Sequence, residues 1–301
     1  SEILVTTGGQ EALFLLAQAL IEPGDEVIVP DPRYTSYDHA IELAGGRIVL
    51  VPTTEADDFE LDPDEVRTRI TPRSKVLLLI SPNNPTAGIN RPETVRRLAS
   101  IAIEHNLIVI SDEIYEKFLY DGAEQISMAS LPGMRERTIT LNGLSKSYAM
   151  TGWRIGYLCA PAEFIQTATA LKRMVNVQAP TVSQWAGVAA LNGPQECVEE
   201  MRRTYAARRA LLMRALSEMG FTYGTPRGGL YIWANTASTG IGSTELSYRF
   251  LQEGGVLILP GTGFGEHWID YMRMTLLQPI EVLEEAIDRM QRTLARQRTA
   301  R

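Results

Sequence analysis

The first half of the chain alternates short apolar segments with segments that have helical spacing. Val95, Leu98, Ala99 and Ala102 recur three or four residues apart, as on one face of a helix. Seven apolar, β-branched segments predict strands at Ile3–Thr6, Glu26–Val29, Arg47–Val51, Val76–Ile80, Leu107–Ser111, Thr138–Leu141 and Ile155–Cys159. This alternation predicts an α/β fold with a mainly parallel seven-stranded sheet and helices on both of its faces.

The pattern changes from about Pro194. One face of a long helix is marked by Val198, Met201, Tyr205, Leu212, Leu216 and Met219. Gly228-Gly229 predicts a turn before a strand at Leu230–Trp233, and further strands are expected at Val256–Leu259 and Tyr271–Leu276. A final helix is indicated by Leu283, Ile287, Met290 and Leu294. We therefore expect a large domain at residues 1–193 and a smaller α+β domain at residues 194–301.

Composition and charge narrow the class of protein. The 301 residues are 45% hydrophobic and 22% charged, which is ordinary globular composition. A formal net charge of −7 without a long basic run argues against nucleic acid as the main partner. The longest apolar runs, such as Val76–Ile80, are too short to cross a membrane. Two cysteines, Cys159 and Cys197, cannot staple a chain of this length, so a reducing cytoplasm is the default expectation.

Ligands of open α/β sheets bind beyond the carboxyl ends of the strands, so the residues that follow each predicted strand are the first candidates for a binding site. Gly8 and Gly9 follow a strand and open a helix, where free N–H groups and the helix dipole suit a phosphate. A purely structural turn is equally compatible with two glycines. The segment is not a nucleotide P-loop, because no Gly-Lys-Ser/Thr follows it.

Two further strand ends carry polar residues. Asn84 lies in the segment Ser81–Thr86, where Asn and Pro are also typical of an ordinary turn. Asp112 ends an apolar strand and precedes Tyr115, and such an acid can simply cap the next helix. Taken alone, both segments leave the functional and the structural interpretation open.

The most informative stretch is Asn142–Gly156. It places Lys146 in a predicted loop after an apolar strand, and Arg154 follows eight positions later, before another strand. A single lysine is usually solvated. The neighbours of Lys146 are Gly, Ser, Tyr, Met and Trp rather than charged residues, which argues against that interpretation here.

This stretch resembles the class I and II aminotransferases, which are pyridoxal-phosphate (PLP) enzymes of the aspartate aminotransferase fold (fold type I). The resemblance extends over essentially the whole chain, with the Gly8-Gly9 turn and Asn84-Pro85-Thr86 in the same order. It implies that Lys146 forms the Schiff base with PLP and moves a proton from the substrate Cα. It also implies that Asp112 faces the pyridine nitrogen, that Tyr115 and Asn84 contact the 3′-oxygen and that Tyr34 stacks on the ring.

The same resemblance implies which residues bind the phosphate of the cofactor and the carboxylate of the substrate. It implies that Gly8, Gly9, Gln10 and Arg154 hold the phosphate, and that Arg273, together with Asn84, binds the substrate, with Arg273 on its α-carboxylate. Physical chemistry is consistent with these roles. A carboxylate keeps a pyridine nitrogen protonated, and the planar fork of arginine suits phosphate and carboxylate groups. A lysine that is buried or flanked by cations has a lowered pKa, which frees its amine to attack a carbonyl.

Two departures from the family pattern stand out. Many relatives have a serine three residues before the lysine, whereas this chain has Gly143 there. Relatives also carry a long segment before the glycine turn, including a tyrosine that reaches the phosphate of the neighbouring subunit. We therefore expect the printed sequence to be part of a longer chain. The resemblance implies a homodimer with shared active sites.

The leading functional prediction is transfer of an amino group between an L-amino acid and a 2-oxo acid, with aspartate and aromatic amino acids as candidate donors. A PLP-dependent carbon–sulfur lyase of the same fold is a second possibility, since it shares the lysine and the aspartate. The sensor domain of a transcription regulator is a third, although no helix-turn-helix is visible. His39, His105 and His267 have no metal-ligand spacing, so we expect them to be structural and expect no metal site.

Overall fold

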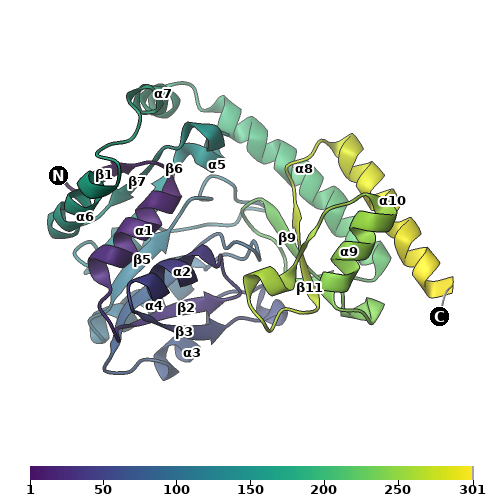
Figure 1. The fold of residues 1–301 in the computed structure, drawn as a ribbon, viewed down its shortest axis with the longest axis horizontal. Helices are drawn as coiled ribbons and strands as arrows, with labels where there is room; N and C mark the ends of the chain where they lie inside the picture. The colour runs from purple at the N-terminus through teal and green to yellow at the C-terminus, as the bar shows by residue number, and fades with distance from the viewer. Residues whose placement is uncertain (300–301) are drawn as a thin grey trace.

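The computed structural model describes residues 1–299 and contains a seven-stranded sheet and a four-stranded sheet (Figure 1). The strands of the large sheet are β1 (Ile3–Thr6), β2 (Glu26–Asp31), β3 (Arg47–Pro52), β4 (Ser74–Ile80), β5 (Ile108–Asp112), β6 (Thr138–Gly143) and β7 (Gly156–Cys159). Their order is β1-β7-β6-β5-β4-β2-β3. Neighbouring strands are parallel except where β7 pairs with β1 and β6, so the predicted mainly parallel seven-stranded sheet is confirmed.

The α-helices are α1 (Gly9–Leu20), α2 (Ser36–Leu43), α3 (Pro63–Thr68), α4 (Pro92–Glu104), α5 (Leu144–Ser147), α6 (Ala162–Val175), α7 (Thr181–Asn192), α8 (Glu196–Met219), α9 (Ser243–Gly254) and α10 (Ile280–Thr299). The helix face predicted from Val198 to Met219 belongs to α8, which runs from α7 towards the small sheet (Figure 1). None of the described helices is both long and apolar enough to cross a membrane.

Helices cover both faces of the large sheet, and strand β4 shows why. Successive side chains of a strand point to opposite faces. Leu78 and Ile80 pack in an apolar cluster with residues of α1, α2 and α6. Leu77 and Leu79 pack in a second cluster with residues of α3 and α4. The central strands are therefore buried on both sides, which explains their uninterrupted apolar sequence.

The small sheet is antiparallel and has the order β10-β11-β9-β8. Its strands are β8 (Thr222–Tyr223), β9 (Tyr231–Asn235), β10 (Leu259–Pro260) and β11 (Tyr271–Thr275). In the pairing of β11 with β9, Arg273 lies opposite Trp233 and Thr275 lies opposite Tyr231. Residues of this sheet share one apolar core with α8, α9 and α10. Tyr115, Phe118 and Tyr120 from the large sheet's side also enter that core.

One predicted strand of this region was wrong. Of Val256–Leu259, only Leu259 belongs to a strand, namely the short β10. Gly255 ends α9 in the left-handed conformation, and the N–H of Val256 donates to the Phe250 carbonyl. Val256 therefore closes the helix instead of extending the sheet, as the residue after a left-handed C-terminal glycine commonly does.

A connecting segment, residues 224–229, joins β8 to β9 and ties the small sheet to loops of the large sheet. The N–H of Gly228 donates to the Ala87 carbonyl at 3.1 Å, and the N–H of Gly229 donates to the Phe118 carbonyl at 2.9 Å. A Cβ atom on Gly228 would lie 2.5 Å from the ring of Pro82, so the two backbones meet closely there. Through Leu230 the segment leads to Tyr231 at the start of β9.

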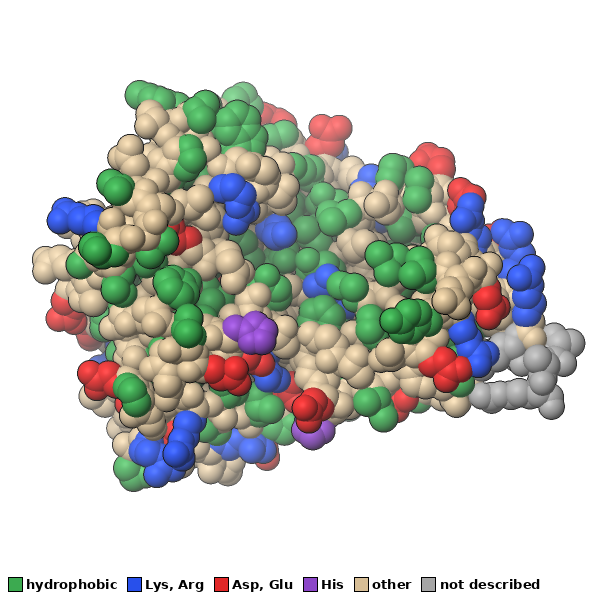
Figure 2. All heavy atoms as spheres, in the orientation of Figure 1, with side chains coloured by type: hydrophobic (Ala, Val, Ile, Leu, Met, Phe, Trp, Pro, Cys, Tyr) green, Lys and Arg blue, Asp and Glu red, His purple; other side chains and the backbone are tan. Residues whose placement is uncertain are grey.

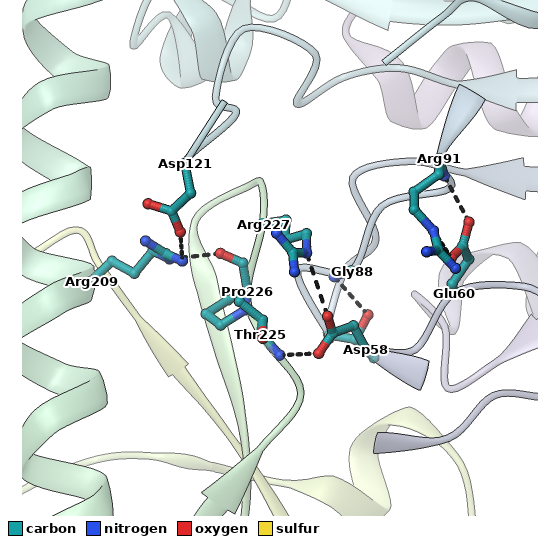
Figure 3. Close-up of polar contacts among 10 residues, drawn as sticks. Asp58, Glu60, Gly88, Arg91, Asp121, Arg209, Thr225, Pro226 and Arg227 are labelled. Carbon is teal, nitrogen blue, oxygen red and sulfur yellow. Dashed lines mark hydrogen bonds and ion pairs between the residues drawn. The ribbon is translucent and has the colours of Figure 1, made fainter. Parts of the chain in front are cut away.

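Side chains reinforce the connecting segment from both sides (Figure 3). Arg209 of α8 is buried, and it donates from Nε to the Pro226 carbonyl at 2.7 Å and from Nη2 to Asp121 at 2.5 Å. Asp58 accepts from the Thr225 N–H at 2.6 Å. The predicted domain boundary after residue 193 falls between α7 and α8, and it stays a prediction.

Candidate active site

A cavity of about 420 Å³ opens where the carboxyl ends of the parallel strands face the small sheet. Figure 2 shows basic side chains set among hydrophobic ones in the hollow between the two lobes of the molecule. Nine of the ten residues predicted from the sequence line this cavity: Gly9, Gln10, Tyr34, Asn84, Asp112, Tyr115, Lys146, Arg154 and Arg273. The tenth, Gly8, lies directly against Arg154. The structure thus brings together residues that are up to 265 positions apart in sequence, from Gly8 to Arg273.

Lys146 lies on the short helix α5, immediately after β6. The sequence predicted a loop at this position, and that prediction was wrong because Lys146 lies in a single helical turn. Ser145 and Ser147 on either side are buried, while Lys146 is half-buried and reaches the cavity. Its Nζ lies 5.9 Å from the centre of the Tyr115 ring. The Lys146 amine is therefore placed to contact a ligand bound in the cavity.

Asp112 ends β5 and is buried at the floor of the cavity. Its Oδ2 accepts a hydrogen bond from the Tyr37 hydroxyl at 2.8 Å, and its Oδ1 accepts one from the Ile114 N–H at 3.1 Å. The chain continues in turns after Asp112, so capping of a following helix does not explain this residue. Burial raises the pKa of Asp112, and the two hydrogen bonds and the charge of Lys146 oppose that rise.

The glycine turn between β1 and α1 forms a narrow cradle beside Arg154. Gly8 has a φ of +79°, and a Cβ atom there would lie 2.3 Å from Arg154 Nη2. A Cβ atom on Gly156 would lie 2.8 Å from the carbonyl carbon of Gly8. Helix α1 begins at Gly9, and the first N–H groups of a helix have no acceptor within it. The cradle therefore offers backbone donors and a guanidinium to one anion.

Arg273 reaches the cavity from strand β11 of the small sheet. Its guanidinium carbon lies 4.3 Å from the centre of the Tyr231 ring and 4.7 Å from that of Phe264. Its Nη1 donates to Asn84 Oδ1 at 2.8 Å. The guanidinium is thus held by two aromatic rings and one amide, in a geometry that suits recognition of a carboxylate.

Tyr115 and Tyr231 meet between the two sheets. Their hydroxyl oxygens are 3.3 Å apart, and their rings pack edge to face with centres 6.0 Å apart. Burial raises the pKa of Tyr115 well above its ordinary value, and the neighbouring Tyr231 raises it further. Tyr115 is therefore a neutral phenol that can donate a hydrogen bond at neutral pH.

Residues 1–290 match the model of the family described as aminotransferase class I and II. The chain is 42% identical to an aspartate aminotransferase of Pyrococcus abyssi, covering 97% of this chain and 76% of that protein. It is 40% identical to aromatic-amino-acid aminotransferase 2 of Thermococcus litoralis, covering 98% and 76%. The solved structure of an aromatic aminotransferase from Pyrococcus horikoshii superposes with a TM-score of 0.96 at 40% identity, covering 99% and 80%.

The chain belongs to the class I and II aminotransferases. This membership confirms the family and the fold expected from the stretch around Lys146, and with them the expectation of an aminotransferase. The three histidines of this aminotransferase, His39, His105 and His267, are exposed. Within residues 1–299, no group of three or more His, Cys, Asp or Glu side chains is placed to hold a metal ion.

Several residues that line the cavity of this aminotransferase were not singled out from the sequence. They include Tyr37, which bonds Asp112, and Tyr231, which lies against Tyr115 and Arg273. Tyr37 follows Tyr34 by three residues and lies in the first turn of α2, whereas Tyr34 precedes the helix. Tyr231 follows the Gly228-Gly229 turn after one residue, Leu230. Those two spacings were the available signals.

The structure also gives a physical reason for Gly143. A Cβ atom at this position would lie 3.1 Å from the Cα of Gly156 and 3.1 Å from the Ile155 carbonyl oxygen. The backbones of β6 and β7 approach each other too closely here for a larger side chain to fit without adjustment. Gly143 therefore belongs to the close packing behind the glycine turn.

Proposed function

We propose that this chain uses PLP, held covalently by Lys146, to transfer an amino group between an L-amino acid and a 2-oxo acid. One observation carries the proposal most strongly. The Lys146 amine and the buried Asp112 carboxylate share one cavity, and separate arginines enter it from the large and small sheets. A cofactor with a carbonyl, a basic ring nitrogen and a phosphate is complementary to that set of groups.

The glycine cradle supports the phosphate end of this proposal. The close contacts at Gly8 and Gly156 leave a small anion in reach of the first N–H groups of α1 and of Arg154. Gly9 and Gln10 begin the helix, and their N–H groups would complete the phosphate site. On the ring, Tyr34 would lie against one face and Asp112 at the pyridine nitrogen. Asn84 and Tyr115 would donate to the 3′-oxygen.

When bound, PLP draws electrons away from the Cα of the substrate, and the protein supplies everything else. Arg273 would bind the substrate carboxylate, with Asn84 holding the guanidinium in place. Lys146, once released from the cofactor, would take the proton from the substrate Cα and deliver it to the cofactor carbon that bears the amino nitrogen. Asp112 would keep the ring nitrogen protonated, because a buried carboxylate favours a cation at hydrogen-bonding distance.

Substrate preference is proposed from the relatives. Proteins at about 40% identity are named as aspartate and as aromatic-amino-acid aminotransferases, so these two donor classes are the first to test. We propose that the chain accepts at least one of them with 2-oxoglutarate as acceptor. The ring of Tyr231 lines the cavity beside Arg273, and such a ring suits contact with an aromatic side chain.

The test is direct. Purified protein is incubated with PLP, reduced with borohydride and mapped by peptide mass spectrometry, while amino donors are assayed with 2-oxoglutarate. PLP attached to Lys146 and formation of glutamate are expected, and both should disappear in Lys146→Ala. Attachment to another lysine, or absence of glutamate with every donor, contradicts the proposal. Release of pyruvate from cystathionine without an acceptor would identify a lyase instead.

We further propose a homodimer in which the subunits complete each other's sites. Support comes from a large exposed apolar surface at α6, α7 and the loop between them, over which hydrophobic side chains gather in Figure 2. Met174, Val177, Val182 and Trp185 are each at least 66% exposed there. Apolar surfaces of this extent are typical of subunit contacts. The free thiols of Cys159 and Cys197 fit the proposal of a cytoplasmic enzyme.

A further inference from the structure

A buried ion pair lies behind the glycine turn. Glu11 is the third residue of α1, and its Oε2 accepts a hydrogen bond from Lys172 Nζ of α6 at 2.7 Å. The same oxygen accepts from the N–H of Thr7, the residue before the turn, at 2.5 Å. Lys172 Nζ also donates to Asn176 Oδ1 at 2.7 Å, and Asn176 Nδ2 donates to the Thr7 hydroxyl at 2.9 Å. Four residues thus fix the chain just ahead of Gly8.

Burial distinguishes this pair from most ion pairs of the described residues, although the pairs of Arg33 with Asp31 and Asp38 are similarly buried. The side chain of Glu11 is 8% exposed and that of Lys172 is 3% exposed. Taking two charges out of water is costly, so a buried pair is weak evidence for stability and stronger evidence for fixing one arrangement. Burial opposes ionisation of Glu11, but the bonds from Lys172 and Thr7 outweigh it, and the pKa of the carboxyl lies below its ordinary value.

Lys172 and the Thr7 N–H both hold the Glu11 carboxylate by its Oε2 atom. The second oxygen, Oε1, is buried and has no hydrogen-bond partner among the described residues. An acidic residue at the third helical position ordinarily reaches back to cap free N–H groups at its own helix start. Such a carboxylate is also attracted by the positive end of the helix dipole. Without Lys172, Glu11 would thus be an internal anion free to compete for the first N–H groups of α1.

We propose that Lys172 and Glu11 are positioning residues for the phosphate of the cofactor. Lys172 neutralises the Glu11 carboxylate and directs it to the N–H of Thr7, which leaves the N–H groups at the start of α1 free for the phosphate. The inference rests on the proposed function, because it concerns the phosphate end of PLP. It assigns a role to residues that line no part of the cavity itself.

The experiment compares PLP with pyridoxal, which lacks the phosphate, for binding to the protein by absorbance titration. Lys172→Met should weaken PLP binding at least tenfold while changing pyridoxal binding less than twofold. The double variant Lys172→Met/Glu11→Gln removes the competing charge and should regain most of the PLP affinity. Arg173→Met is the matched control, because Arg173 is the exposed neighbour of Lys172 on the same helix, and it should bind both ligands normally.

Each outcome decides the matter. Equal weakening of PLP and pyridoxal in Lys172→Met, or no recovery in the double variant, overturns the inference and leaves the proposed function standing. If Lys172→Met does not fold, Asn176→Ala provides the test. Asn176 is exposed, and its loss removes the bond to the Thr7 hydroxyl and one acceptor of Lys172 Nζ, while the pair of Lys172 with Glu11 remains. That variant should lower the ratio of PLP to pyridoxal affinity about threefold, and an unchanged ratio is the contrary result. Wild-type protein that binds no PLP overturns the proposed function, and this inference with it.

Discussion

The hydroxyl of Tyr37 donates a 2.8 Å hydrogen bond to Oδ2 of Asp112, and both side chains are buried under the cavity. This bond stabilises the ionised form of a carboxylate whose burial favours the protonated form. Burial and the charge of Asp112 in turn raise the pKa of Tyr37 well above its ordinary value, so the phenol remains a donor over the whole working range of pH. Tyr37 therefore helps to orient Asp112 and favours its ionised form.

Tyr37→Phe should lower kcat about tenfold, which corresponds to about 1.4 kcal/mol. Loss of the donor raises the pKa of Asp112 further, so the acid limb of kcat/KM should move to higher pH. The measurement is a pH profile of wild type and variant. Tyr248→Phe, at an exposed tyrosine of α9, is the control and should leave the profile unchanged. An acid limb that does not move in Tyr37→Phe would show that the bond only packs the core.

Asp112→Asn should separate stability from activity. The folded-state pKa of Asp112 is raised by burial, so its favourable contribution to folding is present below the ordinary value of 3.8 and is lost as pH rises through the folded value. At neutral pH the ionised carboxylate destabilises the cofactor-free protein. The amide variant should therefore melt at a higher temperature at pH 7 while turnover falls about 100-fold or more.

Calorimetry at pH 7 and at pH 3 tests the sign. The stabilisation by Asp112→Asn should shrink at the lower pH, where wild-type Asp112 is protonated. A lower melting temperature for Asp112→Asn at pH 7 would mean that the carboxylate contributes net stability through its two hydrogen bonds.

Arg273→Lys should weaken the binding of every amino acid donor by about 2–5 kcal/mol, and this loss should appear as a higher KM. An ammonium group cannot stack between Tyr231 and Phe264 or bind a carboxylate through two parallel bonds. Steady-state kinetics with amino acids and with amines that lack a carboxylate provide the test. Amines should be almost unaffected. Arg249→Lys, at a surface pair with Glu245, serves as the control.

Arg209→Met should destabilise the protein by about 1–3 kcal/mol, because it leaves the buried Pro226 carbonyl without its donor (Figure 3). Asp121→Asn should cost less than about 1 kcal/mol, since the Asp121 side chain is 55% exposed. Urea denaturation of the two variants measures both values. Equal costs for the two substitutions would assign the stabilisation to the ion pair instead of the carbonyl.

Sequence patterns predicted the central strands well because those strands are buried on both faces and so carry uninterrupted apolar runs. Val76–Ile80 was placed within β4, and Leu77 and Leu78 alternate between the two faces as expected. Val256–Leu259 is equally apolar, yet Val256 closes α9. A short apolar run does not reveal whether its N–H groups bond a neighbouring strand or the preceding helix.

Local sequence patterns also predicted some residues of the candidate site and missed others. Residues within one motif, such as Lys146 and Arg154, could be predicted together because their spacing is local. The bond between Arg273 and Asn84 joins positions 189 residues apart, and no local spacing encodes it. Tyr37 was missed because its importance comes from contact with Asp112 on another strand. Glu11 and Lys172 meet only because α1 and α6 pack on the same face of the sheet.

The pairing of β11 with β9 has a consequence for how this protein can fail to fold correctly. Arg273 lies opposite Trp233, two residues from Tyr231, so the guanidinium and the Tyr231 ring share one face of the small sheet. A slip of one residue in that pairing would turn Arg273 to the opposite face. The antiparallel ladder would still close, and the molecule would be compact and yet unable to hold a carboxylate. Activity therefore requires the correct register of β9 and β11, and a measurement of secondary structure alone would not detect an incorrect register.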